Sequence, residues 1–228
     1  MKYTLIALLA TAAPALAVTT FTENFDSDNA FWDSATRGVA ATHVSTGGAD
    51  GGGYITNTLD FSDNTAGQNE SLSVIRGEVE APNIASGGAF VGDWISDGVS
   101  TFSVSVRHDS TVPLTFFARF ADPNNFPGAI AVNFAPVFAN TWTELTFAID
   151  TNNPAFVSFE GQTFESVFDN IGDIQIGVSV PDALAGSTDS FTFDIDSASV
   201  VVVDSVPEPS TSLLALLGLG FLARRKRA

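Results

Sequence analysis

The sequence predicts an all-β fold, a two-sheet antiparallel β-sandwich of the jelly-roll type, with a signal helix at the N-terminus and a short hydrophobic helix at the C-terminus. First, polar and apolar residues alternate over many short segments, as in TFSVSVR at 101–107, and this period of two places alternate side chains on opposite faces of a strand. Second, clusters of Gly, Asn, Asp and Pro separate these segments, as turns require. Third, 20 Phe among 45 % hydrophobic residues in 228 are enough for one core.

The predicted elements follow one another closely along the chain. The expected strands are Thr19–Phe25, Val39–Val44, Tyr54–Leu59, Leu72–Ile75, Ala89–Val91, Thr101–Arg107, Leu114–Phe120, Ala129–Phe134, Thr143–Ile149, Ile174–Val180 and Phe191–Val203. One short helix is expected over Phe164–Asn170, with Gly172 as its stop. Because the sequence has no repeat of fixed period, a solenoid or propeller is excluded.

The composition excludes several classes of function. With 26 acidic and 9 basic residues the formal charge is −17, so the chain would repel the phosphates of a nucleic acid. Without cysteine it can form no disulfide, thiolate metal site, iron–sulfur site or cysteine nucleophile.

The N-terminus has the pattern of a secretory signal peptide over residues 1–17. Lys2 precedes an apolar stretch at 5–13, and Ala15 and Ala17 form the small-x-small site that signal peptidase accepts. A buried N-terminal helix is the alternative, which Pro14 disfavours. We expect export, with cleavage after Ala17.

The C-terminus, residues 206–228, has three parts: a proline motif, an apolar run of 11 residues at 213–223, and a basic end. The motif is Val206, Pro207, Glu208, Pro209 and Ser210, and the basic end is Arg224, Arg225, Lys226 and Arg227. The apolar run is well short of the ~20 residues that span a bilayer. The basic end would stay cytoplasmic and leave the upstream chain outside. This pattern is typical of a processed sorting signal, and a short tail anchor is the alternative.

This tail resembles the PEP-CTERM sorting signal of exopolysaccharide-producing Gram-negative bacteria. The resemblance implies processing by exosortase, transient or permanent inner-membrane attachment by the C-terminal helix, and a final location at the cell envelope or in the extracellular matrix. Removal of both ends would leave four arginines against all 26 acidic residues, a net charge of −22, if residues 18–209 are the mature product. Such a surface repels anionic polymers and attracts divalent cations.

The central domain resembles the galactose-binding-like and laminin-B-like jelly rolls of bacterial surface proteins. The segments that carry this resemblance are ENFD at 23–26, GYI at 53–55, GDW at 92–94, TWTEL at 141–145 and FDID at 193–196. The resemblance implies the fold, whereas lectins, adhesins, enzyme accessory modules and plain spacers all use it.

The same resemblance points to a structural calcium ion that ties the first strand to the last. Its expected ligands are Glu23 and Asp26 near the first strand and Asp194 and Asp196 on the last, because Ca²⁺ prefers hard oxygen ligands. The alternative is that these acids only solvate the surface.

The candidate ligand-binding aromatics are Trp32 and Tyr54, which lie next to predicted loops. Sugars bind aromatic platforms that have polar neighbours. Trp94 and Trp142 are expected in the core. We therefore predict a structural or adhesive protein, with extracellular polysaccharide as its candidate partner and a ligand-free spacer as one alternative.

A secreted polysaccharide hydrolase or lyase is the other alternative. Only His43 and His108 could titrate near neutral pH, and the sequence has no Gly-x-Ser-x-Gly nucleophile motif and no Glu-x-Asp-x-x-Glu pattern. We predict that the protein is not an enzyme and that no residue is catalytic.

Overall fold

The computed structural model of the chain describes residues 16–67, 71–80 and 83–205, and the side chains of 19–67, 71–78 and 84–203 within them. Residues 20–202 form one compact unit, and of the terminal segments that flank it only residues 16–19 and 203–205 are described. The predicted signal helix, the C-terminal helix and the proline motif lie outside the described residues. Ala17 is described as part of the first strand, β1 (Leu16–Glu23), which therefore begins inside the predicted signal peptide.

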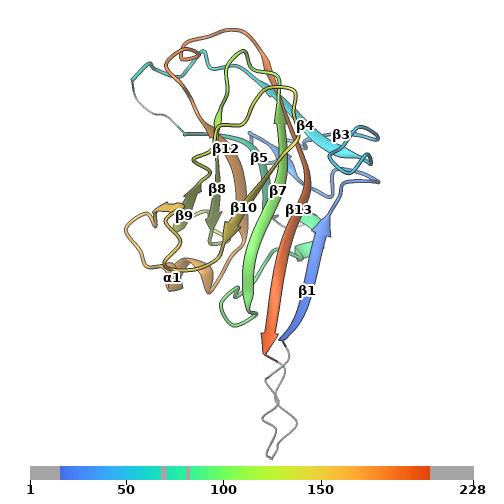
Figure 1. The fold of residues 1–228 in the computed structure, drawn as a ribbon, viewed down its shortest axis with the longest axis vertical. Coiled ribbons are helices and arrows are strands. Elements are labelled where there is room, and N and C mark those ends of the chain that lie inside the picture. Colours follow the sequence, from blue (N-terminus) through green and yellow to red (C-terminus); the bar gives the residue numbers. More distant parts are fainter. Residues whose placement is uncertain (1–15, 68–70, 81–82, 206–228) are drawn as a thin grey trace, which may run out of the picture. The chain divides into compact units, whose positions relative to one another are not determined.

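Two antiparallel sheets form a β-sandwich, as the alternation in the sequence predicted (Figure 1). The six-stranded sheet has the order β10 (Thr143–Ala148), β7 (Val99–His108), β13 (Phe191–Ser205), β4 (Tyr54–Leu59) and β3 (Thr42–Val44), and β1 also pairs with β13. The seven-stranded sheet has the order β11 (Phe156–Ser158), β9 (Gly128–Val132), β8 (Thr115–Ala121), β12 (Asp173–Ser179), β5 (Ser71–Glu80) and β2 (Asp33–Ser34), and β6 (Asn83–Ile84) pairs with β5. A short 3-10 helix, η1 (Ala85–Gly88), and one α-helix, α1 (Phe164–Phe168), complete the described elements.

The core lies between the sheets and is built largely of phenylalanine. Phe102 of β7 contacts Phe120 of β8 with ring centroids 5.2 Å apart, and Phe116 of β8 contacts Phe193 of β13 at 6.4 Å. All four rings are fully buried. Edge-to-face contacts of this kind add to the free energy that aromatic burial provides. Sheet-to-sheet packing thus turns the inward positions of each strand into core and leaves the alternate positions outside.

The predicted helix is present and is shorter than expected. It begins after Thr163, whose Oγ1 accepts from the Ser166 backbone N–H at 3.2 Å, while the Ser166 hydroxyl accepts from the Thr163 N–H at 3.1 Å. This reciprocal capping box satisfies two N–H groups that the first helical turn leaves without partners.

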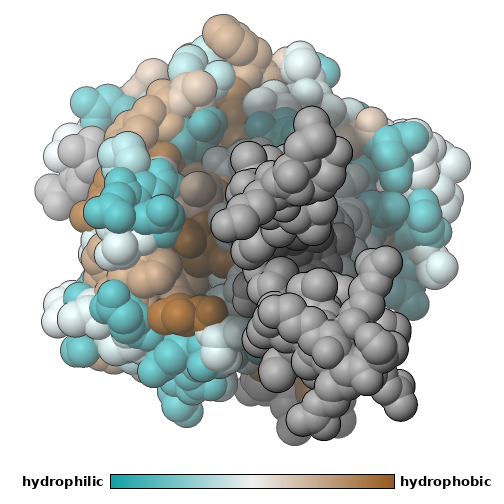
Figure 2. Space-filling model, turned by 60° about the horizontal axis from the view of Figure 1, so that its bottom comes forward, coloured by the Kyte–Doolittle hydropathy of each residue, from teal (hydrophilic) through white to brown (hydrophobic). Residues whose placement is uncertain are grey.

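The surface mixes polar and apolar residues. Figure 2 shows hydrophilic residues (teal) and hydrophobic residues (brown) interspersed on the face turned forward there. The most exposed large hydrophobic side chains are Phe134, Phe138 and Phe126, each at least 60 % exposed. Among the described helices, none is both long and apolar enough to cross a membrane.

Candidate functional site

An arginine flanked by two aromatic rings lies on the outer face of the six-stranded sheet. We call Tyr54, Arg107, Trp142 and Asp194 the Arg107 site. In β7 the side chains of Val106 and His108 are buried, so the alternation of the strand turns Arg107 outward. Asp194 of β13 lies directly opposite Arg107, and Trp142 comes one residue before the Thr143–Val106 pair.

The guanidinium of Arg107 packs against both rings. Its Cζ atom lies 5.0 Å from the centroid of Tyr54 and 4.5 Å from that of Trp142, and the two rings meet edge to face at 5.6 Å. Both distances fall within the range of cation–π interactions. Because the two aromatic residues are only half-buried, the cluster presents aromatic surface and a cation together to the solvent.

Hydrogen bonds hold the cluster in place. Arg107 Nε donates to Asp194 Oδ2 at 2.8 Å, and Trp142 Nε1 donates to the Gly47 carbonyl at 3.1 Å. Arg107 Nη1 donates to the same carbonyl at 3.4 Å. Gly47 has φ +92°, a conformation that favours glycine, and its carbonyl receives both donors. These bonds fix the Trp142 ring, the guanidinium and the carboxylate relative to one another.

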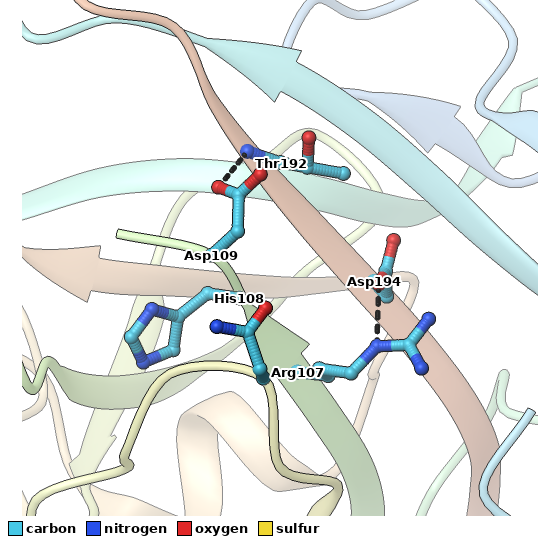
Figure 3. A pocket seen from close by; sticks show the side chains of 6 residues that line it. Arg107, His108, Asp109, Thr192 and Asp194 are labelled. Carbon is cyan, nitrogen blue, oxygen red and sulfur yellow. Dashed lines mark hydrogen bonds and ion pairs between the residues drawn. The ribbon is translucent and has the colours of Figure 1, made fainter. Parts of the chain in front are cut away.

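A pocket of about 230 Å³ adjoins the cluster and shares Arg107 and Asp194 with it. Its other lining residues are His108, Asp109, Asn140 and Thr192. Figure 3 shows Arg107 pointing to Asp194, and Asp109 pointing to the backbone of Thr192, whose N–H donates to Asp109 Oδ1 at 2.7 Å. Donors and acceptors therefore line a small hollow, which shares Arg107 with the two aromatic rings of the cluster.

His108 supports the pocket from inside the fold. Its side chain is 1 % exposed, its Nε2 bonds the Val137 carbonyl at 3.0 Å, and its Nδ1 accepts from the Ser110 N–H at 3.2 Å. These two bonds fit the neutral imidazole that carries its proton on Nε2. Burial lowers the pKa of His108 accordingly. His43, half-buried, bonds the Phe25 carbonyl through Nε2 at 2.7 Å.

Two of the three tryptophans differ from the prediction in whether they are buried or lie at the surface. Trp32 was expected at the surface and is fully buried: it contacts Phe25 and Phe90 edge to face and donates from Nε1 to Ser86 Oγ at 2.8 Å. It therefore offers no platform to a ligand, and that prediction was wrong. Trp142 was expected in the core and belongs to the Arg107 site instead. Trp94, 2 % exposed, is in the core as predicted.

The four acids predicted to hold calcium do not converge as a set. Asp194 is engaged by Arg107, and Glu23 Oε1 accepts from the Phe25 N–H. Asp26 and Asp196 both contact the glycine-rich 48–53 loop, where Asp26 accepts from the Gly53 N–H and Asp196 accepts from the Ala49 N–H. Within residues 16–67, 71–80 and 83–205, no group of three or more His, Cys, Asp or Glu side chains could hold a metal ion. These carboxylates thus do not form the expected ligand set.

The other three arginines of the domain belong to a buried polar cluster on the outer face of the seven-stranded sheet. Its ion pairs are Arg37 with Glu78 and Asp173, Arg76 with Glu78, and Arg119 with Glu160. Arg119 also donates to the side chain and the carbonyl of Asn125, each at 2.7 Å. The hydrogen bond to Arg119 lowers the pKa of Glu160. Glu78 and Asp173 of this cluster are buried, at 5 % and 0 % exposure, whereas the side chain of Arg37 is 39 % exposed.

Comparison with known proteins bears on the C-terminus and on the fold. A model of the PEP-CTERM protein-sorting motif matches residues 205–227. The chain carries a PEP-CTERM sorting motif at its C-terminus. This motif implies processing by exosortase and an exported, cell-surface-associated protein. No curated protein matches the chain.

The β-sandwich resembles those of carbohydrate-binding modules. The family 11 carbohydrate-binding module of the cellulosomal cellulase Lic26A-Cel5E of Clostridium thermocellum is 14 % identical, with 84 % of this chain and 99 % of that chain covered and a TM-score of 0.47. The C-terminal family 22 module of Xyn10B from the same organism is also 14 % identical, with 82 % and 96 % covered and a TM-score of 0.43. A longer Xyn10B chain with CBM22-1 and GH10 modules is 16 % identical, with 79 % of this chain but only 28 % of that chain covered and a TM-score of 0.46. At such identities the likeness concerns the fold alone.

Proposed function

We propose that this is a non-enzymatic, exosortase-processed surface or matrix protein whose β-sandwich binds extracellular polysaccharide at the Arg107 site. The observation that carries the proposal is the placement of Arg107 between two half-exposed aromatic rings, beside a polar pocket. The signal peptide, with cleavage after Ala17, and the two terminal helices remain part of this proposal, as does the jelly-roll connectivity.

The chemistry of the Arg107 site suits a sugar. A pyranose ring has apolar C–H faces, which pack on aromatic rings, and hydroxyl groups, which both donate and accept hydrogen bonds. Tyr54 and Trp142 supply the aromatic surface, Arg107 supplies donors, and Asp109 supplies carboxylate acceptors at the pocket edge.

The two groups near the site whose pKa values are shifted, His108 and Asp196, are poorly placed for catalysis. His108 has both ring nitrogens engaged and lies inside the fold. Burial raises the pKa of Asp196, but this carboxylate is 0 % exposed and accepts from the Ala49 and Ser197 N–H groups, so it cannot reach a substrate. A general acid or base must come within hydrogen-bond distance of the proton that it transfers.

The binding test uses two substitutions at the site and one matched control. We expect Trp142→Ala and Tyr54→Ala to weaken retention on insoluble polysaccharide and binding on a glycan array about 5- to 10-fold, since a lost aromatic contact is worth about 1 kcal/mol. Phe134→Ala removes an aromatic ring that is 68 % exposed and lies outside the site, so it should bind as the wild type does. Unchanged binding by both site variants would refute the assignment, and a wild type that binds no glycan would favour the spacer.

The sorting test is the intact mass and location of the protein in its host, with and without exosortase. We expect a species outside the cell that lacks both ends when the enzyme is present. A full-length tail retained in the membrane under both conditions would show a permanent anchor instead.

A further inference from the structure

We infer that the polysaccharide recognised at the Arg107 site is uncharged, and that acidic polysaccharides are rejected. This inference rests on the proposed function and specifies its ligand class.

The pocket has an excess of negative charge. Arg107 is the one cation among its lining residues, and Asp109 and Asp194 are the two carboxylates. His108 is neutral in its buried position, because protonation of Nδ1 would break the bond from the Ser110 N–H. The lining therefore sums to one net negative charge, and a ligand carboxylate would add a second charge of the same sign.

The charge of Arg107 is already compensated. Its Nε atom donates to Asp194 at 2.8 Å, and the Asp194 side chain is only 9 % exposed. A ligand carboxylate could reach only the Nη atoms of the guanidinium, because Asp194 holds Nε. It would then share one cation with Asp194 and be repelled by that carboxylate, so its net attraction to the pocket is small. A sugar hydroxyl, in contrast, can donate to Asp109 or Asp194 without competing for the guanidinium.

No other cation of the domain can attract an anionic polymer to this face. The remaining three arginines at 18–205 are ion-paired in the cluster on the seven-stranded sheet. Glu144, exposed on β10 and paired with Ser105 one alternation from Arg107, adds negative charge to the face. Salt screens the repulsion between exposed charges, which at 0.1 M ionic strength extends over about 10 Å.

The size of the pocket indicates how the polymer binds. Its volume of about 230 Å³ is below the ~300 Å³ at which pockets for drug-sized ligands begin. We expect it to hold one sugar unit of a chain, so the affinity for a short oligosaccharide is weak, whereas a polymer offers many equivalent positions at which the protein can bind. The test must therefore use polymers rather than monosaccharides.

The experiment compares a neutral polymer with an anionic one at two salt concentrations. The exported protein is run in affinity electrophoresis gels containing a neutral β-glucan, a neutral xylan, or polygalacturonate, at 20 mM and 500 mM NaCl. For at least one neutral polymer, we expect the affinity to change less than 2-fold between the two salt concentrations. The affinity for polygalacturonate at 20 mM NaCl should be at least 10-fold lower than that for this neutral polymer.

Two charge variants test whether the carboxylate at the pocket edge causes the weak binding of polygalacturonate. Asp109→Asn removes one negative charge at the pocket edge and should raise the affinity for polygalacturonate at 20 mM NaCl about 2- to 5-fold. Asp97→Asn is the matched control: Asp97 is exposed and precedes β7 at the end of the strand away from Arg107, so it should change nothing.

The outcomes separate the inference from the proposed function. Polygalacturonate bound as tightly as the neutral polymers or more tightly, and released by salt, would overturn the inference while leaving polysaccharide binding intact. Neutral binding that both Trp142→Ala and Tyr54→Ala leave unchanged would place the ligand elsewhere and overturn both, as would a wild type that binds none of the three polymers.

Discussion

Replacing Arg107 by methionine should destabilise the domain much more than neutralising its partner. Breaking a buried ion pair by removing one partner costs about 3–5 kcal/mol. The Asp194 side chain is 9 % exposed, but that of Arg107 is 25 % exposed, so water partly compensates the loss and we take about 2 kcal/mol. Loss of two cation–π contacts at a half-exposed position adds about 0.5–1 kcal/mol. We therefore expect Arg107→Met to lower the free energy of unfolding by about 3 kcal/mol.

Urea unfolding and a melting scan measure this effect. For a domain of about 150–250 residues, 1 kcal/mol corresponds to a Tm change of about 2–4 °C, so Arg107→Met should lower Tm by about 6–12 °C. Asp194→Asn removes the buried charge itself and leaves a cation that solvent reaches, so its cost should be about 1 kcal/mol. The double variant Arg107→Met/Asp194→Asn should be more stable than Arg107→Met alone. A single variant that costs less than 1 kcal/mol, or a double variant that is no better than Arg107→Met, would refute this account of the pair.

Two further predictions concern the core and pH. Because Trp32 is fully buried, Trp32→Ala should lower the free energy of unfolding by about 3–5 kcal/mol. Polysaccharide binding by the folded variant should be unchanged. Reduced binding at unchanged stability would contradict the place of Trp32 in the core. His108 resists protonation in the fold because burial lowers its pKa, so the unfolded chain binds more protons below the ordinary value of about 6.5. The free energy of unfolding should thus be highest above that pH and fall by up to about 1.4 kcal/mol per pH unit below it, and His108→Gln should flatten this slope; a variant with the wild-type slope would assign the dependence to other groups.

Strands could be predicted from the sequence where polar and apolar residues alternate over many positions. Strands that exist only because they pair with a neighbouring strand could not be predicted. The segment at 101–107 was expected as a strand, and β7 extends over Val99–His108. The edge strands β2 and β6 have only two residues each, too few to show a period. The strand expected at 89–91 is absent, since this segment follows η1, in which Ser86 and Gly87 have positive φ. Such short elements depend on neighbours that are distant in sequence.

The Arg107 site contained a signal that the sequence analysis did not use. In β10, Leu145 and Phe147 are buried, so Glu144 and Thr146 face outward, and the same alternation places Trp142 outward as well. The parity of the strand therefore indicated surface exposure for Trp142, although an aromatic residue at a strand start suggested core. Trp32 precedes a strand of only two residues, where no alternation could show which way it points.

The excess of acidic residues explains why the acids predicted the wrong site. The few arginines would have been better indicators of the candidate site. With 26 carboxylates, several fall near one another on any arrangement of strands, so Asp194 and Asp196 on one face of β13 say little by themselves. The pairing of Asp194 with Arg107 depends on the β7–β13 register, which joins residues 87 apart in the sequence. The domain has only four arginines, and each is ion-paired in the structure. Of these four, Arg107 alone also packs against two half-exposed aromatic rings, and scarce cations therefore locate the candidate site better than abundant acids do.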